Sequence, residues 1–184
     1  MSKRIALLTA AAFGAFALTA TIVAPVNAQE KTVMVGGAAM FPSRNIIQNA
    51  VNSKDHTTLV AAVKAAGLVD TLEGKGPFTV FAPTNAAFGK LPDGTVDNLV
   101  KPENKATLTK ILTYHVVPGK LEASDLSDGK KLKTVEGEEL TVKKANGKVM
   151  IVDAKGDTAT VTISNVNQSN GVIHVVDTVL MPAS

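Results

Sequence analysis

The side chains best suited to chemistry in this sequence are one tyrosine, Tyr114, and three histidines, His56, His115 and His174. The histidines lie far apart, without the short spacings that bring two imidazoles onto one metal ion. Tyr114 directly precedes His115, so a phenol and an imidazole could act as acid and base if a carboxylate lay near them. The sequence therefore predicts no metal site and offers one candidate pair for catalysis.

Other patterns that carry catalysis or ligand binding are absent or incomplete. There is no cysteine, which excludes disulfide bonds, thiol catalysis and cysteine-ligated zinc. No Gly-x-Ser-x-Gly motif occurs, and Lys75, although it lies between two glycines, lacks the spacing of a phosphate-binding loop. Asp153 and Asp157 flank a glycine-containing turn, but two carboxylates are too few ligands for calcium. We therefore expect no cofactor.

The first 28 residues have the composition of a leader. A positive start with Lys3 and Arg4 precedes an Ala/Leu/Phe-rich stretch, and small residues follow up to Ala28. A retained membrane anchor is the alternative. Alanine, threonine and Pro25 in the apolar stretch instead favour a cleavable signal peptide that spans residues 1–28. The mature protein is therefore expected to be secreted or periplasmic, with a bacterial style of leader and no membrane span once the leader is removed.

Removal of the leader also changes the charge. Without Lys3 and Arg4, the 19 basic side chains fall to 17 against 16 acidic ones, so the net charge drops from +3 to about +1. The high isoelectric point, about 9.1, is then no argument for a nucleic-acid partner.

The elements that would position Tyr114 and His115 change in type along the chain. Residues 29–40 contain Gly36 and Gly37 and no clear period, which predicts a flexible N-terminal segment outside the core. Apolar residues at helical spacing follow over residues 46–51, 55–67 and 102–113. Short β-type runs separated by glycine-containing turns follow at residues 132–135, 140–143, 149–152 and 159–163. Helices before strands predict a single α+β domain over residues 41–184.

Three motifs stand out within this domain. FTVFAPTNAAF, residues 78–88, reads as a strand that ends at Pro83, followed by a helix capped by Thr84 or Asn85. YHVVPG follows at residues 114–119, and NGVIHVVDTVLMP at residues 170–182. In this order and spacing the motifs resemble the fasciclin domain, and the resemblance covers roughly residues 41–182. The residues that carry its structural part are Phe78, Phe81, Pro83, Thr84, Asn85, Phe88, Asn170, Gly171, His174 and Asp177.

The resemblance implies a fold and a kind of partner. It implies a β-sheet wedge flanked by a bundle of short helices. In animal members the Tyr-His segment is associated with integrin binding, which makes four residues candidates for partner binding: Tyr114, His115, Val116 and Val117. The Asp-Ile pair of some adhesive members is missing, since residues 164–167 read SNVN. The alternative from the residues themselves is structural, with a packed tyrosine and a histidine that ties the helix end to the sheet.

His174 lies in an alternating strand, which places its side chain on the face of Val172 and Val176, opposite Ile173 and Val175. A packed, hydrogen-bonded histidine is the expected state. Asp177 is expected to brace the neighbouring turn.

The sequence thus predicts an exported, non-catalytic binding or cell-adhesion module whose partner is a protein or a cell-surface or matrix component. The alternative is an envelope protein that binds a small molecule or a polymer in a groove between helices and sheet. A third hypothesis is an enzyme that uses Tyr114 and His115 with a carboxylate.

Overall fold

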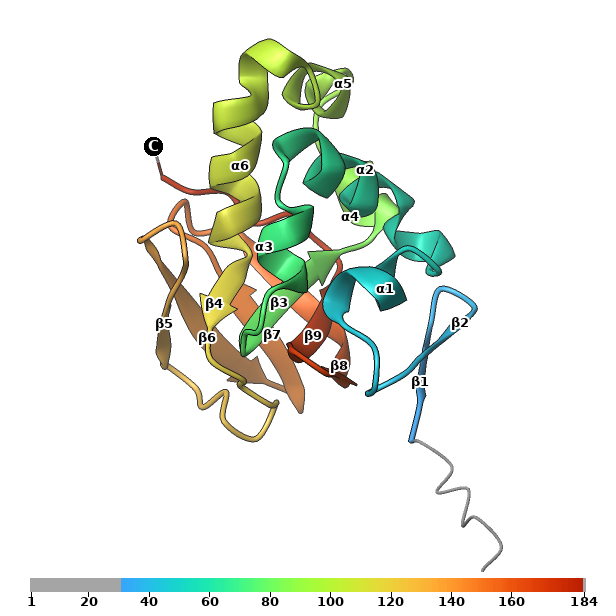
Figure 1. Cartoon of the computed structure of the whole chain (residues 1–184). Helices are drawn as coiled ribbons and strands as arrows, with labels where there is room; N and C mark the ends of the chain where they lie inside the picture. Colours follow the sequence, from blue (N-terminus) through green and yellow to red (C-terminus); the bar gives the residue numbers. More distant parts are fainter. Residues whose placement is uncertain (1–30, 184) are drawn as a thin grey trace, which may run out of the picture.

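The computed structural model describes residues 31–183, which form a seven-stranded sheet with short helices packed against part of it (Figure 1). The strand order in this sheet is β4-β3-β9-β8-β7-β6-β5. Its strands are β3 (Phe78–Pro83), β4 (Val116–Pro118), β5 (Lys131–Lys133), β6 (Glu139–Ala145), β7 (Lys148–Val152), β8 (Thr158–Gln168) and β9 (Gly171–Val176). The predicted α+β class is confirmed.

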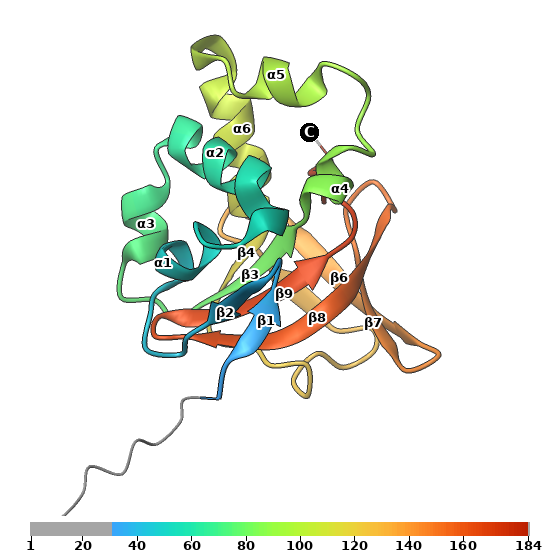
Figure 2. The same ribbon diagram turned by 90° about the vertical axis from the view of Figure 1, so that its right-hand side faces the viewer.

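The helices precede most of this sheet in the chain and gather on one side of it (Figures 1 and 2). They are α1 (Ile46–Ala50), α2 (Thr57–Ala66), α3 (Val69–Glu73), α4 (Asn85–Phe88), α5 (Thr95–Leu99) and α6 (Lys105–Tyr114), with short 3-10 helices η1 (Lys54–His56) and η2 (Pro102–Asn104). The longest two, α2 and α6, pack against each other. Each buries an apolar stripe, Leu59, Ala62, Val63 and Ala66 in α2 and Leu108, Ile111 and Leu112 in α6.

Strand β8 joins the two halves of the sheet. Its first residues pair with β7, as in Met150 opposite Thr160, and its later residues pair with β9, as in Val166 opposite Ile173. Two register shifts interrupt its pairing with β9, one between Val161 and Ile163 and one between Ile163 and Val166, and such irregularities bend a strand and increase its twist. The sheet therefore folds toward itself into the expected wedge.

Two apolar clusters fill this arrangement. The first lies between the helices and strands β3 and β9 and includes Leu59, Val80 and Ile173. The second lies inside the bent sheet and includes Phe81 and Tyr114. Because neighbouring residues of a strand point to opposite faces, Val80 and Phe81 join different clusters.

The strand-to-helix motif folds as its residue types predict. Strand β3 ends at Pro83, and the Thr84 hydroxyl accepts a hydrogen bond from the Ala87 N–H at 3.2 Å, which caps α4. The side chain of Asn85 instead contacts a residue outside the motif: it accepts a hydrogen bond from the Thr58 N–H at 3.0 Å. Asn85 also donates to the Lys54 carbonyl at 2.8 Å, so it fixes the start of α2 against α4.

The prediction that residues 29–40 stay outside the core is wrong for their described part. Strands β1 (Val33–Val35) and β2 (Ala38–Met40) form an antiparallel hairpin beside β8 (Figure 2). Val35 and Met40 are each 3% exposed and belong to the first cluster. Gly36, at the turn, has φ +57, and a Cβ atom there would collide with the Ser53 side chain, so glycine is required. The predicted signal peptide, residues 1–28, lies outside the described residues.

Candidate functional site

Tyr114 is the last residue of α6 and is fully buried in the second cluster. Its hydroxyl accepts a hydrogen bond from the Ala154 N–H at 2.8 Å and donates to the Glu139 carbonyl at 3.3 Å. Burial raises the pKa of Tyr114 to about 12, so the phenol stays protonated at neutral pH. The hydroxyl therefore links β6 and the β7–β8 turn to the helix, and it is not available as a base.

His115 lies between α6 and β4 with 2% of its surface exposed. Its Nδ1 donates to the Ile111 carbonyl at 2.8 Å, and its Nε2 accepts from the Leu180 N–H at 2.9 Å, which assigns the neutral tautomer. Burial lowers the pKa of His115 to about 4. Both ring nitrogens are thus engaged in joining the helix end to the C-terminal segment, and neither is free for proton transfer.

His174 lies in the centre of β9 and is fully buried. Its Nε2 donates to the Leu121 carbonyl at 2.7 Å, Nδ1 accepts from the Asn165 N–H at 3.4 Å, and the ring stacks on Phe81 with 5.7 Å between centroids. Burial lowers the pKa of His174. The predicted faces are also observed, since Val176 joins the second cluster and Ile173 the first. The packed, hydrogen-bonded histidine expected from the sequence is present.

The remaining residues of the Tyr-His segment are internal as well. Val116 and Val117 are 5% and 3% exposed and belong to different clusters. A partner cannot touch any of the four side chains unless the structure around them opens. Their role in partner binding stays a prediction, whereas their contribution to packing is directly visible.

The other motif residues hold loops together. The Asn170 side chain accepts from the Ile46 N–H at 3.1 Å and donates to the Leu72 carbonyl at 2.7 Å, which ties α1 and α3 to the sheet. Beside it, a Cβ atom on Gly171 would lie 2.0 Å from the Phe78 carbonyl oxygen, so only glycine permits this approach of β9 to β3. Asp177 accepts from the Thr160 N–H at 2.8 Å and braces its turn as expected.

Asp153 has a structural role that the sequence did not reveal. Its carboxylate accepts from the backbone N–H groups of Lys155 at 3.0 Å, Asp157 at 2.8 Å and Met181 at 2.9 Å. It is 6% exposed, so these bonds replace water around a buried charge. Within residues 31–183 there is no group of three or more metal-ligating side chains. The signal that could have pointed to a turn rather than to calcium is Asp153 followed three residues later by Gly156, because aspartate side chains often accept from the N–H two residues on and glycine suits a turn.

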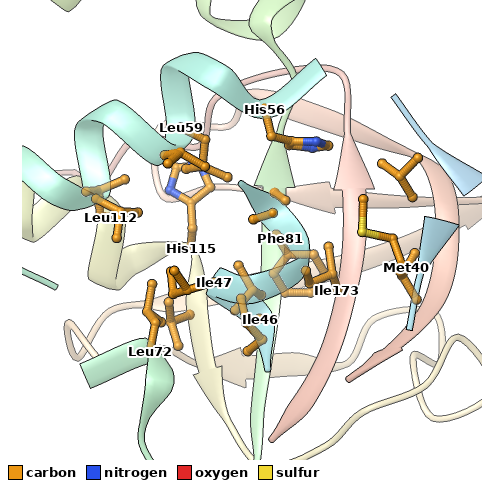
Figure 3. A pocket seen from close by; sticks show the side chains of 18 residues that line it. Met40, Ile46, Ile47, His56, Leu59, Leu72, Phe81, Leu112, His115 and Ile173 are labelled. Carbon is orange, nitrogen blue, oxygen red and sulfur yellow. The ribbon is translucent and has the colours of Figure 1, made fainter. Parts of the chain in front are cut away.

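A small apolar cavity lies between the helices and β3 (Figure 3). Its volume is about 40 Å³, and the side chains around it include Met40, Leu59, Phe81 and Ile173. His56 borders it with 3% exposure; Nδ1 lies 2.9 Å from the Ser53 hydroxyl, and Nε2 has no hydrogen-bond partner among residues 31–183. Burial lowers the pKa of His56. Ligand pockets usually measure roughly 300–1,000 Å³, so this cavity takes no ligand of that size.

A larger concavity opens on the opposite half of the sheet, where β7 and β8 separate. β7 pairs with β8 only as far as Met150, so the β6–β7 hairpin tip stands away from β8 and leaves a groove of about 860 Å³. The groove is lined by Ala123, Ser124, Lys144, Gly147, Lys148, Val149, Thr160, Val161, Thr162 and Ser164. Residues with hydroxyl and ammonium groups thus line this groove together with the apolar residues Val149 and Val161.

The bent, nearly closed sheet with its bundle of short helices defines a fasciclin-type module. Residues 54–182 match the fasciclin domain family, and the chain belongs to that family. A solved FAS1 domain pair from the insect cell adhesion molecule Fasciclin I has the same fold, with a TM-score of 0.68 at 20% identity, over 77% of this chain and 52% of that one. The resemblance proposed from the three motifs is confirmed.

Bacterial proteins are more similar in sequence. Protein sll1483 of Synechocystis sp. is 46% identical over 181 residues, which cover 98% of this chain and 97% of that protein. The immunogenic protein MPT70 of Mycobacterium tuberculosis is 38% identical over 72% of this chain and 66% of its own length. The cell surface glycolipoprotein MPB83 of Mycobacterium bovis is 40% identical over 80% of this chain and 64% of its own length.

Proposed function

We propose that the mature chain is an exported, non-catalytic binding module that attaches to a protein or to a cell-surface or matrix component. Its family membership supports a binding role, as do the name of the mycobacterial cell-surface relative and the adhesion molecule that shares its fold. The predicted leader supports export. Among residues 31–183 no helix is long and apolar enough to cross a membrane.

The observation that carries the proposal is the state of the candidate acid and base. The Tyr114 hydroxyl and both nitrogens of His115 are buried and hydrogen-bonded to the backbone. A general acid or base must reach the substrate directly or through one water molecule. These groups can do so only after the core opens, which argues against the enzyme hypothesis and leaves the exposed surface to act.

The small-molecule alternative finds less support. The cavity between helices and sheet measures about 40 Å³, which is too small for a ligand of ordinary size in this conformation. Polymer binding, the other half of that alternative, needs no internal cavity, and the groove between β7 and β8 is open to it.

The experiment is retention of envelope and matrix components on immobilised mature protein, residues 29–184. We expect saturable binding by the wild type and by Tyr114→Phe, which keeps the packed ring, and none by heat-unfolded protein. Tyr114→Ala should lower the melting temperature, and if it also removes binding it does so through this loss of stability, since Tyr114 acts first through the core. Loss of binding by Tyr114→Ala with unchanged stability would instead place Tyr114 in the interface. Turnover of a substrate by the purified protein would refute the proposal.

A further inference from the structure

The outer face of strands β5 to β8 collects lysines and hydroxyl groups. Leu132, Val142, Ile151 and Ala159 point into the second cluster, so the residues beside them in each strand point outward. The outward basic residues are Lys131, Lys133, Lys143 and Lys148, all of them exposed. The outward hydroxyl residues are Thr141, Thr158, Thr160 and Thr162, and Ser164 follows them in β8. We call this set the lysine–hydroxyl face.

The sheet register places three of these lysines in a line. Lys131 lies opposite Thr141, two residues before Lys143, and Lys143 lies opposite Met150, two residues after Lys148. With about 4.8 Å between strands and about 3.4 Å per residue, successive Cα atoms in this line are about 8 Å apart. Lys148 also borders the groove between β7 and β8, so the line ends at a concave site.

The charge of this face is poorly balanced. Its outward acidic residue, Glu139, forms an ion pair with Lys131 at 3.3 Å. Lys133 lies directly opposite Glu139 in the register, so two lysines share this carboxylate, whereas Lys143 lies opposite Met150. The outward positions of these strands thus carry four lysines against one glutamate, whereas the mature chain as a whole has a net charge of only about +1.

The chemistry of the groove selects among anionic partners. Ser124, Thr160 and Ser164 offer hydroxyls that donate and accept hydrogen bonds, as a sugar requires, beside the half-buried side chains of Val149 and Val161, which pack against the second cluster. A membrane surface would call for large apolar side chains to insert, but the exposed ones among residues 31–183, Met34, Val51 and Val135, lie outside these four strands. Single-stranded nucleic acid would call for aromatic side chains on which bases stack, and the outward positions of β5–β8 carry none.

We propose that the lysine–hydroxyl face and its groove bind an acidic polysaccharide, a polymer of carboxylated or sulfated sugars. A sugar unit lies in the groove against the hydroxyls of β8, and the chain runs along Lys148, Lys143 and Lys131, which contact its anionic groups. This inference rests on the proposed binding function and gives that function a partner of defined chemistry.

The test is binding of the mature protein to polygalacturonate and heparin at low and high salt, with neutral dextran and phosphatidylglycerol vesicles as comparison partners. We expect saturable binding to the acidic polymers that weakens with salt, and no binding to dextran. Lys143→Gln with Lys148→Gln should raise Kd by about fivefold or more. Lys75→Gln with Lys101→Gln, the same charge change at exposed positions of the helical half, should raise it by less than about twofold.

A second pair of substitutions separates sugar recognition from charge alone. Thr160→Val with Ser164→Ala removes two hydroxyls of the groove without changing the charge. We expect this pair to raise Kd for the polysaccharides by about two- to threefold, while circular dichroism melts confirm that all variants fold.

Three results would overturn the inference: no binding to either acidic polymer, equal losses from both lysine pairs, or binding to vesicles alone. The same experiments distinguish a failure of this inference from a failure of the proposed function. If immobilised protein still retains a partner while the polysaccharides do not bind, only the choice of partner is wrong, and if nothing is retained and nothing binds, both are wrong.

Discussion

The fold uses polar side chains in opposite ways in two regions. Around the end of α6, Tyr114, His115 and His174 are at most 2% exposed, and their polar atoms hydrogen-bond to the backbone. On the lysine–hydroxyl face the ammonium groups are exposed, and the ion pair of Lys131 with Glu139 occupies one of them. The motif that is easiest to recognise in the sequence is therefore interior, while a surface without a motif faces the solvent. Stability should depend on the first region and binding on the second.

The largest effect on stability is expected from Tyr114→Ala. Removing a fully buried aromatic ring leaves a cavity in the second cluster, and such changes cost about 3–5 kcal/mol. The Ala154 N–H loses its acceptor as well. Urea unfolding followed by circular dichroism gives the free energy of unfolding.

Tyr114→Phe is the matched control, because it keeps the ring and removes only the hydroxyl. It should cost about 1–2 kcal/mol, the usual penalty for an unpaired backbone N–H group. If the two variants were equally stable, the ring would not be part of the core and the contrast between the two regions would fail.

The pH dependence of stability comes next. The pKa of His115 is about 4 in the folded protein and near 6.5 when unfolded, so below pH 6.5 the unfolded chain binds a proton that the folded chain does not. The contribution of His115 is complete above about pH 6.5 and is lost as the pH falls toward 4, which amounts to about 3 kcal/mol. His56 and His174 act in the same direction, because burial lowers their pKa values too.

The measurement is the free energy of unfolding between about pH 7 and pH 4.5. His115→Gln cannot titrate and serves as the comparison. Its stability should fall less steeply with acid than that of the wild type, although it is lower at neutral pH. Parallel curves for the two proteins would mean that the ring is accessible to protons in the folded state.

A smaller decrease in the free energy of unfolding is expected from Asp153→Ala. The variant leaves three backbone N–H groups without their acceptor, among them that of Met181, which ties the C-terminal segment to the β7–β8 turn. The cost should be about 1–3 kcal/mol, measured by thermal and urea unfolding. Calcium should not raise the melting temperature of the wild type, since the carboxylate is already engaged. A calcium-dependent rise that Asp153→Ala abolishes would show that this turn binds calcium after all.

The parts of the fold that the sequence predicted are those decided by local chemistry. Pro83 ends a strand and Thr84 caps a helix through bonds to residues at most three positions away. The alternation around His174 likewise assigned its face from its neighbours. These features need no knowledge of distant segments.

The features that the sequence did not predict depend on distant contacts. The hairpin of β1 and β2 has strands of three residues, too short for a period, and it is held by burial of Val35 and Met40 and by the Lys54 N–H to the Gly36 carbonyl. The parallel pairing of β3 with β9 joins segments that lie far apart in the sequence, as in Phe78 opposite Gly171. The line of lysines appears only when the register of β5, β6 and β7 is known.

The smallest effect on stability is expected from the lysine–hydroxyl face. Lys143→Gln with Lys148→Gln removes two exposed charges that make no ion pair with the described residues, so the free energy of unfolding should change by less than about 0.5 kcal/mol. Any shift should be toward higher stability at low salt and vanish at high salt, because the substitutions relieve repulsion between lysines. Urea unfolding at the two salt concentrations measures this. Should the pair destabilise the protein as strongly as Asp153→Ala, these lysines would belong to the folded framework, and their loss could no longer separate binding from stability.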